Sequence, residues 1–420
     1  MVTLSQKELQ RMRVIEKTVD GRLSVREAAG LLQRSERQVQ RLKSRFQADS
    51  VDWVRHGNGG QVKPWALSPV VRQQVLDLAR TTYAGFNDSH LHSKLIESQG
   101  LSLSRETVRR ILRAAGLSSP QKRRPRKYRA RRPRRPRRGM MLQADASRHD
   151  WLEGRGPRLT LIGFQDDATS QVLAARFQLE PENAVGYLCC LEQLITSHGV
   201  PLSLYRDRHS IFQRNDPHWT PQEELLGHQF PTQVGQALER LGIQQIPANS
   251  PQAKGRIERL WRTFQDRLIS ELRLVNACTL EQANRVLTDF CTDFNRRFAV
   301  PAAQSGNDFR SLPRSFDLAR CLSFCYQRTV APDHTIAFAG ETIQLPPTSS
   351  HRGYAGAVVE LSHQLDGSLR LYRANQLLLT LQRPLLELIQ PKPAIRSATL
   401  KRKIPRIYNL GGRPALAAAT

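Results

Sequence analysis

The chain has 420 residues and a formal net charge of +27, because 64 Lys and Arg residues outnumber 37 Asp and Glu residues. A hydrophobic fraction of 39%, without any apolar run of the roughly 18 residues that a spanning helix needs, excludes an integral membrane protein. The chain start carries no basic-then-apolar leader pattern and the six cysteines include no Cys-x-x-Cys pair, so we expect reduced thiols in a cytoplasmic protein and no zinc ribbon.

The positive charge is concentrated at the two ends of the chain. Residues 1–138 hold 32 basic and 11 acidic residues, residues 139–391 hold 25 and 26, and residues 392–420 hold 7 and none. A charge that served only solubility would be spread evenly, so this distribution predicts two basic arms around a nearly neutral body. The partner that such arms fit is a polyanion, with nucleic acid ahead of an acidic membrane surface.

Residues 23–46 have the pattern of a helix-turn-helix. Ser24 with Glu27, and Ser35 with Gln38, each match a capping box, so two short helices are predicted in close succession. Each helix has one apolar stripe, and the second presents a polar face suited to a DNA major groove, formed by Arg34, Arg37, Gln40 and Arg41. The alternative is an ordinary helical hairpin with a basic face.

A weaker second copy of this pattern follows. Ser68 and Pro69 predict a helix start, a second helix begins near Phe86, and Ser104 caps a third. The outer face of the third helix is basic, with Arg105, Arg109, Arg110 and Arg113. Two such motifs in tandem indicate recognition of a long DNA site.

Residues 122–138 form the most basic stretch of the chain. Twelve of the 17 residues are Lys or Arg and three are Pro, so neither a helix nor a core is expected there. We predict an extended tether that neutralises phosphates and places arginines in a minor groove, among them Arg131, Arg132, Arg134 and Arg135. The alternative is a solvated linker between domains.

The sequence after the tether predicts a layered α/β domain, because hairpin strands are followed by alternating helix and strand. The predicted elements are a strand over 140–145 that ends in Asp145, a hairpin of 159–164 and 172–177, a helix over 182–198, a strand over 202–207 that ends in Asp207, a helix near 234–241, a strand over 243–246 and a long helix from 249 that carries Glu258.

Acids at strand ends, with one on a helix, can converge at one edge of a sheet. Carboxylate oxygens of this kind hold Mg²⁺ or Mn²⁺, and two such ions clamp the attacking and leaving oxygens in phosphoryl transfer. Lys254, Glu258 and Arg262 share one helix face, which fits a metal ligand flanked by cations that bind phosphate. A salt-bridged surface helix explains the same three residues.

Four blocks of this sequence together resemble those of the DDE transposases. The blocks are Asp145–Leu152, Asp166–Thr169, Asp207–Phe212 and Asn249–Arg259. The similarity is closest to the ISNCY-type insertion-sequence transposases, which are related to retroviral integrases, and it covers nearly the whole chain. The resemblance implies an RNase H-like catalytic core with Asp145, Asp207 and Glu258 as the metal-binding catalytic triad.

The sequence departs from the integrase pattern at two places. Asp207 and Glu258 are farther apart than the equivalent residues of integrases, so residues 213–229 look like an insertion. The N-terminal His and Cys zinc module of integrases is absent, since the first cysteine is Cys189, and the helix-turn-helix modules would replace it. Among the other acids, Asp166 and Asp167 are interpreted as residues of a hairpin turn.

The C-terminal part changes to β texture from about residue 328. Short strands and an Asp366-Gly367 hairpin turn predict a small barrel, which resembles the SH3-like barrel that follows the core in integrases. The whole chain is thus expected to be multidomain. The predicted domains are an all-α helix-turn-helix domain over 1–60, a second over 61–120, a basic linker over 121–138, the RNase H-like α/β core over 139–300, the barrel and its preceding linker over 301–390, and a basic tail over 391–420.

Two functions of different classes remain open on the sequence. The first is a transposase that cuts insertion-sequence ends and transfers the 3′-OH to target DNA, with Mg²⁺ or Mn²⁺ and two ions expected. Its partners would be double-stranded DNA, as terminal inverted repeats and target, and further copies of the chain on that DNA, at the bacterial nucleoid in the cytoplasm. The alternative is a non-catalytic or domesticated sequence-specific DNA-binding protein that represses its own element.

Overall fold

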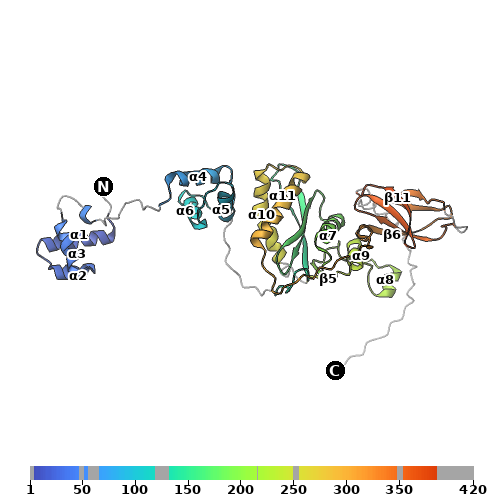
Figure 1. The fold of residues 1–420 in the computed structure, drawn as a ribbon, viewed down its shortest axis with the longest axis horizontal. Coiled ribbons are helices and arrows are strands. Elements are labelled where there is room, and N and C mark those ends of the chain that lie inside the picture. Colours follow the sequence, from blue (N-terminus) through green and yellow to red (C-terminus); the bar gives the residue numbers. More distant parts are fainter. Residues whose placement is uncertain are drawn as a thin grey trace, which may run out of the picture. The chain divides into compact units, whose positions relative to one another are not determined.

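The computed structural model describes residues 4–46, 52–54, 66–118, 132–214, 216–248, 255–347 and 353–385 (Figure 1). The chain divides into two compact units, Met1–Asp77 and Leu78–Thr420. The division falls inside the helix α4 (Pro69–Arg80), which begins where Ser68 and Pro69 predict it. Most of the predicted tether (122–131), the block ahead of Gly255 that contains Lys254, and the tail from 386 lie outside the described residues.

The first unit is a small helical bundle whose first three helices each begin at a capping box. Its elements are α1 (Gln6–Val19), α2 (Val25–Leu32), α3 (Glu36–Ser44) and the short helix η1 (Asp52–Val54). The capping boxes at Ser24 and Ser35 are confirmed, because each serine side chain accepts from the third backbone amide while Glu27 or Gln38 accepts from the serine amide. The buried core comprises Val14, Ile15, Ala28, Ala29 and Val39.

The second unit opens with two further helices that the sequence predicts. Asn87 caps α5 (Asp88–Glu97), and Ser104 caps α6 (Arg105–Ala114) as expected. Leu91 and Leu95 of α5 and Val108, Ile111 and Leu112 of α6 are buried, while the arginines of α6 face outward. The next element is the central sheet of the unit.

That sheet has five strands in the order β3-β2-β1-β4-β5. The strands are β1 (Leu142–His149), β2 (Leu159–Asp166), β3 (Val172–Gln178), β4 (Ser203–Arg206) and β5 (Gln244–Pro247). The first three pair in antiparallel fashion through the predicted hairpin, and β4 and β5 join in parallel after helical crossovers. All eight residues of β2 are buried, as expected for a strand covered on both faces.

Helices cover both faces of this sheet, so the domain has three layers. Figure 1 shows α10 and α11 on one side of the sheet and α7 on the other. The helices are α7 (Ala184–His198), α8 (Pro221–Leu226), α9 (Gln233–Arg240), α10 (Gly255–Leu274) and α11 (Leu280–Phe298). Alternate residues of β2 point to opposite sides: Ile162 and Phe164 pack with α7, whereas Leu159 and Leu161 pack with α10 and α11.

The first strand of the sheet differs from its prediction. It was expected to end in Asp145, but Asp145 is the fourth of eight residues in β1. The reason is the antiparallel ladder with β2, which continues as far as the pair His149 and Leu159. Strand length is therefore set by the partner strand, which sequence alternation in β1 alone does not reveal.

The C-terminal strands do not close into a barrel over the residues that are described. A four-stranded sheet has the order β11-β10-β9-β6, and β7 and β8 form a separate pair. The predicted Asp366-Gly367 turn is confirmed, with Gly367 at φ +85 between β9 and β10. The elements are α12 (Leu318–Cys321), β6 (Phe324–Thr329), β7 (Thr335–Phe338), β8 (Glu341–Gln344), β9 (Val358–His363), β10 (Ser368–Arg373) and β11 (Gln376–Gln382).

None of the helices in the described ranges is both long and apolar enough to cross a membrane.

A single core residue tests the packing of the first unit. Val39 on α3 is fully buried, whereas its neighbour Gln40 is exposed. Val39→Ala should lower the free energy of opening of α2 and α3 by about 2 kcal/mol, because two methyl groups leave a packed core. Native-state hydrogen exchange of the full chain measures this, and Gln40→Ala should leave the exchange unchanged. Equal exchange in the two variants would contradict the burial of Val39.

Candidate active site

The register of β1 and β4 relates the positions of Asp145 and Asp207. The parallel ladder of β1 and β4 pairs Leu142 with Leu204 and Gln143 with Tyr205. Continued for two more residues, the same register sets Asp145 beside Asp207, which directly follows β4. Residues aligned in register on parallel strands point to the same face, so the extended register predicts that the two carboxylates lie on one face of the sheet.

Asp145 is held by a tryptophan of the helix that crosses its strand. The Trp261 indole N–H donates to Asp145 Oδ2 at 3.0 Å. Gly163 is the cross-strand partner of Asp145, and a Cβ at Gly163 would lie 2.9 Å from Trp261 Cη2. The glycine therefore leaves room for the indole to lie on the sheet, where it orients a half-buried carboxylate.

Asp207 is oriented by the loop that it begins. Its Oδ1 accepts from the His209 backbone amide at 3.0 Å. The buried Arg206 donates to the Asp207 carbonyl at 2.9 Å and to Gln245 Oε1 at 3.1 Å. These bonds fix the direction in which the chain leaves β4, so the position of Asp207 is set by the local backbone and by β5.

A further carboxylate near the pair, Glu182, was missed by sequence reasoning. Glu182 precedes α7, and its Oε1 accepts from the Tyr187 hydroxyl at 2.6 Å. Burial raises the pKa of Glu182 above its ordinary value, and the negative charges of Asp207 and Asp145 raise it further, while the Tyr187 hydrogen bond and His209 act against this. Glu182 lies outside the four blocks that carry the family resemblance, so no local signal pointed to it.

Glu258 lies in the first turn of α10 and is exposed. Its two neighbours along the helix are anchored to β1. The Ile257 amide donates to Gln143 Oε1 at 3.3 Å, and Trp261, nearly one turn later, binds Asp145. Over the described ranges no group of three or more His, Cys, Asp or Glu side chains is arranged to hold a metal ion. The register of β1 and β4, continued by two residues, aligns Asp145 with Asp207, and Glu258 lies on α10, whose Trp261 binds Asp145.

The predicted hairpin-turn acids prove to be buried. Asp166 performs the turn role, because its Oδ2 accepts from the Thr169 amide at 2.8 Å and from the Thr169 hydroxyl at 2.7 Å. Asp167 is fully buried and accepts from Arg132 and Arg256. Arg134 donates to the Asp167 carbonyl at 2.9 Å. The described end of the tether therefore lies on the core, and two of its predicted DNA-binding guanidinium groups have protein partners.

The remaining residues predicted to bind DNA divide into two groups. Exposed side chains are Arg34, Arg37, Gln40 and Arg41 around α3, Arg105, Arg109, Arg110 and Arg113 on α6, the tether residue Arg135, and Arg262 on α10. Two arginines of α6 also form ion pairs, Arg113 with Asp88 at 2.6 Å and Arg109 with Glu106 at 3.7 Å. Arg131 and Lys254 lie outside the described residues.

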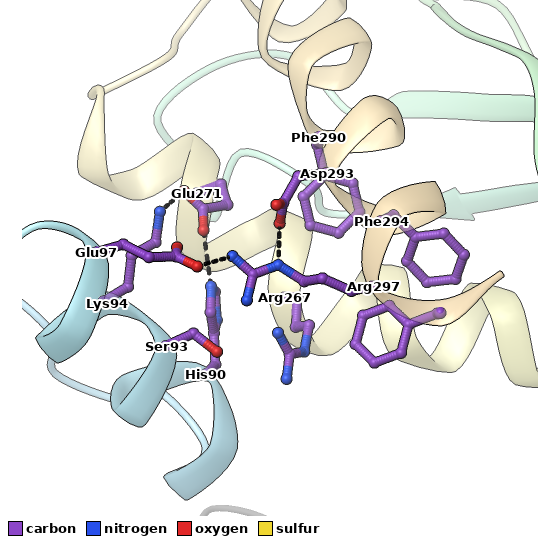
Figure 2. A pocket seen from close by; sticks show the side chains of 11 residues that line it. His90, Ser93, Lys94, Glu97, Arg267, Glu271, Phe290, Asp293, Phe294 and Arg297 are labelled. Atoms are coloured by element: carbon purple, nitrogen blue, oxygen red, sulfur yellow. Dashed lines mark hydrogen bonds and ion pairs between the residues drawn. The ribbon is translucent and has the colours of Figure 1, made fainter. Parts of the chain in front are cut away.

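A small pocket lies where α5 contacts α10 and α11, within the second unit (Figure 2). Glu271 of α10 accepts from His90 Nε2 and from Lys94 Nζ, both at 2.7 Å. Arg297 of α11 pairs with Glu97 of α5 and with Asp293. Burial lowers the pKa of His90 below its ordinary value, although the Glu271 hydrogen bond acts in the opposite direction. This contact is polar and charged, so it is sensitive to protonation.

Comparison with known proteins gives matches over most of the chain. The model of a homeodomain-like domain matches residues 5–52. A putative transposase, y4bF, of Sinorhizobium fredii is 37% identical over 370 residues, covering 88% of this chain and 79% of the relative. The transposase for insertion sequence IS1202 of Streptococcus pneumoniae is 30% identical over 366 residues, covering 79% of this chain and 76% of the relative.

Among solved structures, similarity is found to a chain of the simian T-cell lymphotropic virus intasome in complex with the PP2A regulatory subunit B56 gamma. The TM-score is 0.31 at 14% identity, and the match covers 74% of this chain and 99% of the other.

Gly163 gives a direct test of the Trp261 contact. Gly163→Ala should displace the indole, break its hydrogen bond to Asp145 and destabilise the core by about 1–3 kcal/mol, because the added methyl overpacks the interface. Thermal unfolding and tryptophan fluorescence of the full chain measure both effects. Gly30→Ala is the control, since nothing lies within 4 Å of that position in α2. A fold as stable as the native chain in Gly163→Ala would refute the contact.

The α5 contact should weaken on acidification. His90 binds a proton less readily in the folded unit than when exposed, so below its ordinary pKa of 6.5 the open state gains protons and stability falls as pH falls. Glu271, whose pKa is lowered by His90 and Lys94 despite burial, adds a loss in the same direction at lower pH. Hydrogen exchange of α5 in the full chain at pH 7.5 and 5.5 measures this. His90→Phe should remove the upper part of the dependence, and an unchanged profile in that variant would contradict the assignment.

Proposed function

Because the chain belongs to the DDE transposases of insertion sequences, we propose that it cuts the ends of such an element and joins them to target DNA. The observation that supports the proposed chemistry is the register of β1 and β4, which, continued by two residues, would set Asp145 beside Asp207. Glu258, on the helix that packs against Asp145 through Trp261, is proposed as the third member of the triad.

The donor set suits a hard divalent cation. Asp145 and Asp207 offer carboxylate oxygens, and after burial, which is the main cause, their negative charges also raise the pKa of Glu182. We propose that Asp145, Asp207 and Glu258 would hold Mg²⁺ or Mn²⁺, as two ions. When bound, such ions supply positive charge that stabilises the pentavalent phosphate and lowers the pKa of the attacking hydroxyl group.

The proposed reaction consists of two transfers at phosphorus. Water first attacks the phosphodiester at the end of the element, the bond to the 3′ oxygen breaks, and that oxygen leaves as a 3′-OH. The freed 3′-OH then attacks a target phosphodiester, forms one P–O bond and displaces another. One bond forms for each bond broken, so no nucleotide cofactor is required.

The chain's own residues prepare this site by fixing direction and charge. Trp261 holds one oxygen of Asp145, and the His209 amide holds one oxygen of Asp207, so each carboxylate is kept in one orientation at the sheet edge. Burial and the Glu182 carboxylate raise the pKa of Tyr187, so the tyrosine remains a protonated donor to Glu182. The strand, the loop and the turn before α7 thus each contribute one oriented acid.

We propose that the predicted domains have separate roles in this function. The helix-turn-helix unit and the second helical region, with their exposed arginines, would bind the terminal inverted repeats of double-stranded DNA. The strand order of the central sheet, with an antiparallel hairpin followed by parallel strands, supports an RNase H-like core. Assembly of several copies on paired DNA ends, and a place at the bacterial nucleoid in the cytoplasm, complete the proposal.

The triad is tested by removing charge without changing shape. Asp145→Asn and Glu258→Gln should each abolish cleavage and joining of labelled end DNA in Mg²⁺, with losses of at least about 1,000-fold, while leaving end binding intact. Asp289→Asn, an exposed acid on α11, is the matched control and should react as the native chain does. Full joining activity in either triad variant would overturn the assignment. Tight binding by the native chain without any strand chemistry would favour the repressor alternative.

A further inference from the structure

Asp167 connects four segments of the chain through one buried carboxylate. It follows β2 directly, its side chain is fully buried, and its backbone amide donates to the Met141 carbonyl at 3.0 Å. The groups that bind it come from the tether, from β1 and from the start of α10. The tether and β1 follow one another in the sequence, whereas Asp167 and α10 are distant from both and from each other, so the residue acts as a junction between distant parts of the chain.

The carboxylate is fully occupied by donors. Oδ1 accepts from Arg132 and Arg256, both at 2.5 Å, and from Gln143 Nε2 at 2.7 Å. Oδ2 accepts from the Arg135 backbone amide at 2.9 Å. Arg256 also donates to the Arg132 carbonyl at 2.6 Å, which closes a ring between the tether and α10.

Two of these donors lead directly to the proposed catalytic glutamate. Arg256 is two residues before Glu258 in the first turn of α10. Gln143 donates to Asp167 with its amide nitrogen and accepts from the Ile257 amide at 3.3 Å with its oxygen. The first turn of a helix has backbone amides without partners inside the helix, so such external anchors decide where it begins.

The buried charge is stable only because its partners are present. Burial by itself raises the pKa of Asp167, but the hydrogen bonds from Arg132 and the Arg135 amide, together with the charges of Arg256 and Arg132, outweigh burial and hold that pKa below its ordinary value. Removing one partner of a buried ion pair leaves an uncompensated charge, which is far more costly than losing an exposed pair. The tether and α10 are therefore each held in place by the same oxygen.

We propose that Asp167 is the positioning residue for Glu258, and that the tether must be seated on the core through Arg132 and Arg135 for the glutamate to take its place. This positioning role rests on the proposed catalytic function of Glu258. It assigns Arg132 to the frame of the active site, in addition to the contact with DNA that its sequence context predicts. Binding by the basic arm and placement of the catalytic acid are thereby linked.

Asp167→Asn tests the proposal, with Asp289→Asn as the matched control for loss of one acidic charge. In full-length protein saturated with end DNA, the single-turnover rate of joining should fall by about 10- to 100-fold, the range seen when a group that orients a ligand is removed. The affinity for end DNA should change less than about twofold, because the exposed arginines of α3 and α6 are untouched. A loss of affinity equal to the loss of rate would overturn the positioning role.

Hydrogen exchange gives a readout that does not depend on activity. In Asp167→Asn the amides of Ile257–Leu260 should exchange at least about tenfold faster, while those of α11 stay at the native rate. Native exchange in this turn would overturn the proposal. If the native chain joins no DNA, the proposed function fails, yet the exchange result still decides whether Asp167 anchors α10. If Asp167→Asn does not fold, Arg256→Gln takes its place with the same expectations, and Arg256→Lys should recover part of the rate.

Arg132 is compared with Arg37 to separate positioning from DNA contact. Arg132→Gln should slow joining and speed exchange at the start of α10, whereas Arg37→Gln should weaken end binding and reduce the salt slope by about one without altering that exchange. If Arg132→Gln behaved like Arg37→Gln in both measurements, the tether would act only on DNA and the proposal would be wrong.

Discussion

Packing of α10 across β1 is the constraint on which the candidate site depends. Trp261 occupies the space left by Gly163 and binds Asp145, while the amide before Glu258 binds Gln143. The helix cannot slide or rotate on the sheet without breaking both hydrogen bonds and lifting a buried apolar face from the core. Glu258 is exposed, but its position is therefore defined by the buried residues Ile257 and Trp261 of the same helix.

The segment 213–229, which is predicted to be an insertion, is closed on itself. Glu223 of α8 is fully buried and binds Arg214 at 2.5 Å and the Phe230 amide at 2.7 Å. These bonds join the beginning of the segment to the residue that follows its end, so the length of the segment does not affect the positions of β4 or α10. A larger separation between Asp207 and Glu258 along the chain is thus compatible with their places on neighbouring elements.

Features that depend on residues close together in the sequence were predicted correctly, whereas features that depend on pairing between distant segments were not. The caps at Ser24 and Ser35 and the Asp366-Gly367 turn depend on residues three or fewer apart, so the sequence reveals them. The end of β1 depends on its pairing with β2. The C-terminal sheet, found in place of the expected barrel, likewise depends on which strands pair, and the alternation of apolar and polar residues does not specify that. Glu182 was missed since its relation to Asp145 and Asp207 exists only in three dimensions.

The buried junction at Asp167 also changes how the charge of the chain is interpreted. A count along the sequence assumes that every arginine of residues 122–138 is available to phosphate. A guanidinium that is paired with a buried carboxylate can bind phosphate, and so release a counterion, only after it leaves that carboxylate. Leaving is costly because the carboxylate is then a buried charge without a partner. Arg132 meets this condition and Arg134 is bound to backbone and Ser170 oxygens of the same turn. Arg132 and Arg134 therefore contribute less to phosphate binding than a count along the sequence suggests, whereas the exposed side chain of Arg135 stays a predicted DNA contact.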